Sequence, residues 1–262
     1  MRKIIYILCI VFIGILVFLY SMIQDIDAES FTYKELDVLA IGNSNLYSAF
    51  SPKLFYKLYK KESYVMATAS QSIDEAYTYL CDFLEQCPPK IVLFETDELY
   101  CSRNPKKLHE NNQITLCNQK KVLEVSHTKN RGKDFDKYGF RKSRRIIPYI
   151  GFSHMIKTNQ IQSISKGTYQ YIQKMVTICK ENKIPFVLIS VPCAMDWNME
   201  KHNAVTQVAN ELQIPYYDLN LSKDIQMNWL LDSRDGGIHL NNNGAIKVTK
   251  IIGQLLFGRA VK

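Results

Sequence analysis

Several sequence patterns that would assign a protein to a familiar class are missing from this 262-residue chain. Its seven cysteines include no C-x-x-C pair, so neither a zinc ribbon nor a dithiol redox site is expected. No internal repeat and no low-complexity segment is present. Hydrophobic residues make up 47% and charged residues 22%, which is typical of a globular protein and not of a disordered one. We therefore expect the cysteines to be small buried apolar residues, and we predict no disulfide.

Charge is absent from one long segment near the N-terminus, Ile4–Ile23. A helix of this length would reach about 30 Å, the thickness of the hydrocarbon core of a bilayer. Basic residues precede the segment and acidic residues follow it, which by the positive-inside rule places the N-terminus in the cytoplasm and the rest outside. A cleaved signal peptide is the alternative, but its apolar region is usually about 7–15 residues long. We predict an uncleaved single-pass anchor and linker over 1–27 and an extracytoplasmic domain over 28–262 at the cell membrane.

Strand and helix patterns alternate after this segment. Continuous apolar runs of five or six residues predict buried parallel strands, and amphipathic periods after capping signals at Ser51 and Ser72 predict helices. The expected strands are 36–41, 64–69, 90–95, 186–191 and 215–220, and the expected helices begin near 52, 73, 169, 199 and 243. Five such units predict an α/β fold, a three-layer α/β/α sandwich around a five-stranded parallel sheet.

The alternation breaks between about residues 100 and 166, which we interpret as an insertion. Within it, Lys120–Arg145 is rich in lysine and arginine. The simplest interpretation is a solvated surface. With a formal net charge of +8, the stretch could also face anionic envelope polymers or lipid headgroups. Nucleic acid is not an expected partner of an exported domain.

Polar residues follow the expected strands, where open parallel sheets bind ligands. The first strand ends in "IGNSN", which contains Ser44, and the last loop contains "DSRDGGIHL", with Asp232, Asp235 and His239. An imidazole can take the proton of a serine hydroxyl when a carboxylate orients it. The alternatives are that Ser44 and His239 are ordinary turn and loop residues. A metal site on this loop is not predicted, because no second cluster of ligands accompanies it.

The segments "IGNSNLYSAFSP" and "DGGIHLNNNGAIKVT" resemble the SGNH (GDSL-type) hydrolase superfamily. More narrowly, they resemble its membrane-anchored bacterial cell-envelope branch, which includes the D-alanine transfer protein of teichoic acids and alginate O-acetylation proteins. The resemblance covers about residues 37–257 and implies the flavodoxin-like SGNH fold. It implies a nucleophile at Ser44, a base at His239, an orienting carboxylate at Asp235, and no cofactor.

The sequence departs from the pattern of that superfamily in three places. The glycine expected after the second strand is replaced near Ser70, and no asparagine follows the third strand, which offers Thr96 and Asp97. The usual Asp-x-x-His spacing is lengthened by one, so either Asp235 or Asp232 is left as the orienting carboxylate. The oxyanion and substrate contacts are therefore assigned to four other residues: Asn45, Ser70, Gln71 and Trp197.

Two functions of different classes remain open from the sequence. The first is a serine esterase or O-acyltransferase acting on acyl groups, in particular acetyl groups, of an envelope glycan or a small acylated substrate. The second is a catalytically weak scaffold or glycan-binding partner of a polytopic membrane-bound O-acyltransferase. The anchor favours transfer by analogy with related proteins.

Overall fold

The computed structural model describes residues 35–101 and 132–258. The predicted anchor and the first part of the basic stretch lie outside the described residues. Within the two described ranges, no helix combines the length and the apolar character that crossing a bilayer requires.

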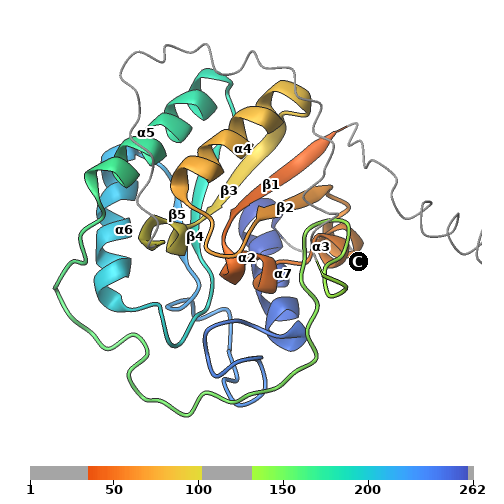
Figure 1. Ribbon diagram of the computed structural model, residues 1–262, viewed down its shortest axis with the longest axis vertical. Helices are drawn as coiled ribbons and strands as arrows, with labels where there is room; N and C mark the ends of the chain where they lie inside the picture. The colour runs from red at the N-terminus through yellow and green to blue at the C-terminus, as the bar shows by residue number, and fades with distance from the viewer. Residues whose placement is uncertain (1–34, 102–131, 259–262) are drawn as a thin grey trace, which may run out of the picture.

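The centre of the fold is a five-stranded parallel sheet in the order β2-β1-β3-β4-β5 (Figure 1). The prediction of five parallel strands is confirmed. Their observed bounds are β1 (Leu36–Gly42), β2 (Ser63–Ala67), β3 (Pro89–Glu95), β4 (Phe186–Ser190) and β5 (Tyr216–Asp218).

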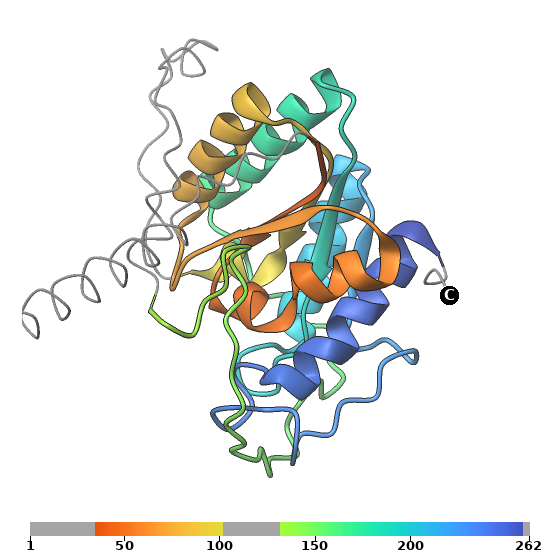
Figure 2. The ribbon, with the colours of Figure 1, turned by 90° about the vertical axis from the view of Figure 1, so that its right-hand side faces the viewer.

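Helices cover both faces of the sheet (Figures 1 and 2). Because successive side chains of a strand point to opposite faces, Leu39 and Ile41 of β1 join one core cluster, while Val38 and Ala40 join the other. The first face packs against α4 (Ile73–Gln86), α5 (Lys166–Glu181) and α6 (Met199–Leu212). The second packs against α2 (Ser44–Ala49), α3 (Pro52–Tyr59) and α7 (Asn242–Phe257). A single 3₁₀ turn, η1 (Thr96–Tyr100), follows β3.

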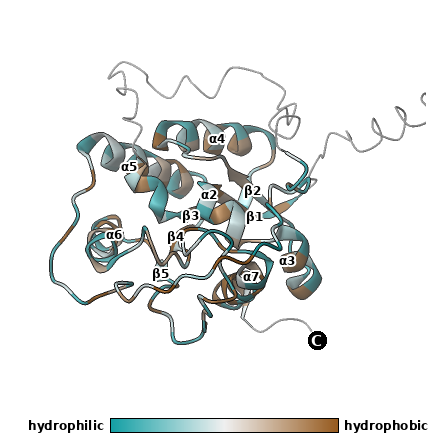
Figure 3. Cartoon of the chain, turned by 60° about the horizontal axis from the view of Figure 1, so that its bottom comes forward, coloured by the Kyte–Doolittle hydropathy of each residue, from teal (hydrophilic) through white to brown (hydrophobic). Residues whose placement is uncertain are grey.

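Local capping explains where several helices begin. The Ser51 hydroxyl accepts the backbone N–H of Leu54 at 3.5 Å at the start of α3. At the start of α4, the Glu75 carboxylate accepts the backbone N–H of Ser72 at 2.9 Å. Both helix starts agree with the prediction. In Figure 3 the helices carry both hydrophilic and hydrophobic residues along their length, as amphipathic helices do.

Cys81 in α4, Cys179 in α5 and Cys193 after β4 are buried, as expected for small apolar residues, whereas Cys87 and Cys101 are only partly buried. The helix α2 was not predicted. It has only six residues, too few to show a helical period, yet it carries the serine on which the functional prediction depends.

Candidate active site

The site lies where the connections from neighbouring strands leave the sheet on opposite faces. The chain leaves β1 into α2 on one face, whereas the helices that follow β2 and β3 pack on the other face. Such a switch point leaves a crevice at the carboxyl ends of the strands. Ser44 is the first residue of α2 and stands directly at this crevice.

Tight packing positions the turn that carries Ser44. A Cβ atom on Gly42, the last residue of β1, would lie 2.6 Å from the Cβ of Glu95, so only glycine fits between β1 and β3 at this point. Asn43 then caps α2, its side-chain oxygen accepting the backbone N–H of Asn45 at 2.9 Å. The start of α2 is therefore fixed by residues on both sides of the nucleophile candidate.

Asp97, in the turn after β3, also stabilises the start of α2. Its carboxylate accepts the side-chain amides of Asn43 at 3.0 Å and Asn45 at 3.1 Å. Lys201 of α6 pairs with the same carboxylate at 3.1 Å and balances its charge. The side-chain amide of Asn45, which the sequence assigned to oxyanion or substrate contacts, thus donates to Asp97.

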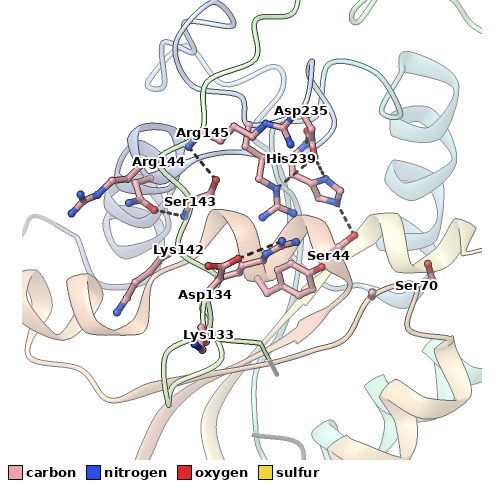
Figure 4. Close-up of a pocket in the computed structure, with 15 residues that line it drawn as sticks. Ser44, Ser70, Lys133, Asp134, Lys142, Ser143, Arg144, Arg145, Asp235 and His239 are labelled. Carbon is pink, nitrogen blue, oxygen red and sulfur yellow. Dashed lines mark hydrogen bonds and ion pairs between the residues drawn. The ribbon is translucent and has the colours of Figure 1, made fainter. Parts of the chain in front are cut away.

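Residues far apart in the sequence meet at the crevice (Figure 4). The Nε2 atom of His239 lies 2.8 Å from the Oγ atom of Ser44, 195 positions away. The Nδ1 atom of His239 lies 2.5 Å from Oδ2 of Asp235, and the backbone N–H of His239 donates to Oδ1 of the same carboxylate at 2.7 Å. With Nδ1–H donated to the carboxylate, Nε2 is left as an acceptor that faces the serine hydroxyl.

The protonation states favour this arrangement. Burial lowers the pKa of His239 below its ordinary value, and the neighbouring Arg234 and Arg141 guanidinium groups lower it further, against the raising effect of the Asp235 hydrogen bond. Burial alone would raise the pKa of Asp235, but hydrogen bonds from His239 and the nearby Arg234 outweigh it, and the pKa is lowered. At neutral pH the pair is therefore a neutral imidazole beside an ionised carboxylate.

Asp232, the other carboxylate considered for the orienting role, is engaged elsewhere. It is buried, pairs with Lys247 of α7 at 2.6 Å, and accepts the backbone N–H of Asn228 at 2.6 Å. Of the two carboxylates, only Asp235 bonds to the imidazole of His239 within the described chain.

The remaining predicted contact residues have different surroundings. Ser70 lines the cavity beside Ser44 and has a positive φ of 52°, the left-handed backbone conformation that glycine adopts most readily. Gln71 is fully buried, and its side-chain oxygen accepts the backbone N–H of Thr68 at 3.0 Å. Trp197 is buried too, and its indole N–H donates to Asp218 at 2.9 Å. Neither Gln71 nor Trp197 lines the cavity.

The cavity also contains residues to which the sequence reasoning gave no role at the site. Its volume is about 940 Å³. Besides Ser44, Ser70, Asp235 and His239, its walls are formed by Tyr47, Ala69, Lys133, Asp134, Arg141, Lys142, Ser143, Arg144, Arg145, Arg234 and Asn242. The available signals were the position of Arg234 next to Asp235 and the basic run that ends at Arg145. That run was interpreted first as solvated surface, and its end lines the same cavity as the serine (Figure 4).

No protein-family model and no curated protein matches this sequence. Solved structures of similar fold include a GDSL-like lipase from Bacteroides thetaiotaomicron, with 14% identity, 90% of this chain and 96% of that chain covered, and a TM-score of 0.45. A lipase/acylhydrolase from Enterococcus faecalis has 10% identity and a TM-score of 0.46, and the match covers 86% of this chain and 98% of that chain. A psychrotrophic esterase from a Pseudoalteromonas species has 12% identity and a TM-score of 0.42, and the match covers 82% of this chain and 94% of that chain.

Proposed function

We propose that this protein is a serine-dependent esterase or O-acyltransferase. The observation that carries the proposal is the continuous hydrogen-bonded series from the Ser44 hydroxyl through the His239 imidazole to the Asp235 carboxylate, with contacts of 2.8 and 2.5 Å. A hydroxyl is a weak nucleophile at neutral pH, and this geometry supplies the base that activates it.

In the first half of the reaction, Ser44 Oγ attacks the carbonyl carbon of an ester while His239 Nε2 takes the hydroxyl proton. Asp235 stabilises the imidazolium that forms. The tetrahedral intermediate then collapses, the bond to the alcohol oxygen breaks, and His239 returns the proton to the departing alkoxide. The acyl group remains on Ser44 as an ester.

In the second half, an incoming hydroxyl compound gives its proton to His239 and attacks the acyl-serine carbonyl. The bond to Ser44 Oγ breaks, and the serine recovers the proton from His239. With water as the acceptor the product is a carboxylic acid, and with a sugar hydroxyl it is a new ester. Both outcomes use the same three residues.

Two backbone N–H groups are candidates for stabilising the oxyanion, those of Ser44 and Ser70. Ser44 begins α2, and Ser70 lies beside it on the cavity wall. The turn after β3 supplies no third donor of the usual kind, because Asp97 is an acceptor there. Loss of one such donor can lower the rate by about 10²–10³-fold, so we expect modest turnover.

For the biological setting, we propose an acylated cell-envelope glycan as the substrate and a single-pass membrane location. The support is the uncharged segment Ile4–Ile23 with basic residues before it and acidic residues after it. A membrane-bound O-acyltransferase is a candidate partner that would supply or receive the acyl group.

Covalent labelling tests the proposed reaction. The full-length protein in detergent is incubated with a fluorescent fluorophosphonate, which reacts with activated serines, and turnover of an aryl acetate is followed in parallel. We expect labelling of the native protein and of the control Ser163→Ala, whose serine is exposed outside the cavity, and no labelling of Ser44→Ala. A folded protein that neither labels nor hydrolyses the ester would contradict the enzymatic function and favour the scaffold.

A further inference from the structure

The charge of the cavity wall is strongly one-sided. Among the described residues, six cationic side chains line it, and only two carboxylates, Asp134 and Asp235, accompany them. The cations are Lys133, Arg141, Lys142, Arg144, Arg145 and Arg234. Every arginine within residues 35–101 and 132–258 is among these six, although lysines are spread over the whole described surface.

The two carboxylates are already engaged. Asp134 lies 3.7 Å from Arg141, and Asp235 holds His239 and lies 3.5 Å from Arg234. The other four cations of the wall form no ion pair with any described residue. The cavity therefore has an excess of positive charge that the described part of the chain does not compensate.

Arg234 shows the same excess at the buried end of the cavity. Only 6% of its surface is exposed, its guanidinium lies over the ring of Tyr47 at 6.0 Å, and its Nη1 has no acceptor among the described residues. The carboxylate of Asp235, 3.5 Å from Nε, is its ion-pair partner among the described residues, and the same carboxylate also holds His239. Arg234 therefore adds to the positive potential of the cavity beside the nucleophile.

The cationic wall is held in place by backbone hydrogen bonds. The N–H of Arg141 donates to the carbonyl of Tyr47 in α2 at 2.8 Å. Ser143 and Asn242 are joined twice, since the N–H of Ser143 donates to the Asn242 side chain and the N–H of Asn242 donates to the Ser143 carbonyl, both at 2.8 Å. The backbone of the segment is thus attached to α2 and α7, which keeps its basic residues at the cavity wall before any ligand arrives (Figure 4).

We propose that the acyl ester processed at Ser44 belongs to a substrate that carries phosphate, and that Arg141, Arg144, Arg145 and Arg234 bind that phosphate. This inference rests on the proposed function. Arginine presents a planar fork that binds phosphate oxygens in pairs. The four wall cations without an ion pair among the described residues are Lys133, Lys142, Arg144 and Arg145. Together with Arg141 and Arg234 they suit a group with more than one negative charge better than a single carboxylate. The shared chemistry is a phosphate ester, whether from a soluble or polymeric molecule or from a lipid headgroup.

The test compares two esters with the same scissile bond, O-acetylglycerol phosphate and O-acetylglycerol, by acetate release from the full-length protein in neutral detergent. We expect kcat/KM to be at least about tenfold higher for the phosphate ester at low salt and the advantage to shrink in high salt. The double variant Arg144→Gln/Arg145→Gln should lose most of that ratio. A control with two exposed lysines replaced outside the cavity, Lys183→Gln/Lys223→Gln, should keep it. Equal turnover of the two esters by the native protein would overturn the proposal.

A binding measurement separates this proposal from the reaction itself. Glycerol phosphate should bind to Ser44→Ala protein in calorimetry, and the Arg144→Gln/Arg145→Gln changes should weaken that binding. Binding without fluorophosphonate labelling of the native protein would leave the phosphate site standing and remove the reaction. Labelling of the native protein without glycerol phosphate binding would support the reaction and overturn the phosphate site.

Vesicles distinguish the two sources of phosphate. In this test the protein is sedimented with phosphatidylglycerol vesicles. Sedimentation that depends on Arg144 and Arg145, without any preference between the two soluble esters, would overturn the role of these arginines in substrate binding. The arginines would then bind the membrane surface.

Discussion

At the scale of single residues, Asp232 and Asp235 lie on one loop and have opposite surroundings. Asp235 is bonded to the imidazole of His239, whereas Asp232 is bonded to Lys247. Their spacing from His239 in the sequence left either one as the candidate that orients the imidazole. Their hydrogen bonds assign this role to Asp235, and mutation of each residue tests the assignment.

Asp235→Asn is expected to lower kcat by about 10³–10⁴-fold with little loss of stability. An asparagine amide can donate to Nδ1 of His239, which would place the ring proton on Nε2 and remove the acceptor for Ser44. Asp232→Asn is the matched control. It should lower the free energy of unfolding by about 1–3 kcal/mol through loss of the Lys247 pair and leave the rate of fluorophosphonate labelling near that of the native protein. The reverse pattern would assign the orienting role to Asp232.

The pKa of His239 predicts the acid limb of the pH–rate profile. Only the neutral imidazole can take the serine proton, so kcat/KM should fall as the pH drops through the pKa of His239. Because burial and the two arginines lower this pKa, the fall should be centred below the ordinary value of about 6.5. The described charged groups that act on the ring are Asp235, Arg234 and Arg141.

Arg141→Gln should move the acid limb to higher pH, because it removes a positive charge that disfavours the imidazolium. The control Lys223→Gln, outside the cavity, should leave the limb in place. An acid limb centred above 6.5 in the native protein, or one that does not respond to Arg141→Gln, would contradict the assignment of His239 as the base.

At the scale of elements, α7 fixes the end of the loop that carries His239. The helix packs against α3, and Gly253 lies directly beneath the ring of Tyr59. A Cβ atom at Gly253 would lie 2.0 Å from that ring, while the Tyr59 hydroxyl donates to the carbonyl of Lys250 at 2.7 Å. The two helices can approach this closely only because residue 253 has no side chain.

Gly253→Ala is therefore expected to destabilise the protein by about 1–3 kcal/mol, because the steric clash costs more than the higher helix propensity of alanine contributes. The measurement is urea unfolding followed by circular dichroism. Gly132→Ala is the control, since a Cβ there has no neighbour within 4 Å among the described residues. A variant at 253 as stable as the native protein would show that the α3–α7 contact adjusts without cost.

The prediction of secondary structure succeeded where local signals are strong. The helix α6 begins at residue 199 as predicted, and α3 and α4 begin directly after the capping serines. It failed for α2, whose six residues are stabilised by the Asn43 cap and by tertiary contacts instead of by a periodic apolar face. The prediction for the basic segment was incomplete for a similar reason, because its partners in α2 and α7 lie far away in the sequence.

At the scale of the whole molecule, the predicted anchor concerns residues outside the described part. Deletion of residues 1–27 should release the protein from the membrane fraction, whereas the full-length chain should stay in the pellet after carbonate extraction. Protease added to spheroplasts should digest the domain of the full-length chain. A mature N-terminus beyond residue 23, found by mass spectrometry, would support the cleaved signal peptide instead.

The sequence by itself determined the alternation of strands and helices, because apolar period and capping act over a few neighbouring residues. It also determined which chemical groups stand at the strand ends. Only the tertiary structure decided that Asp235 and not Asp232 bonds to His239, and that four arginines line the cavity that contains Ser44. The physical reason is distance along the chain: contacts between residues almost two hundred positions apart depend on how the sheet, α2 and α7 pack together, and no local pattern encodes that packing.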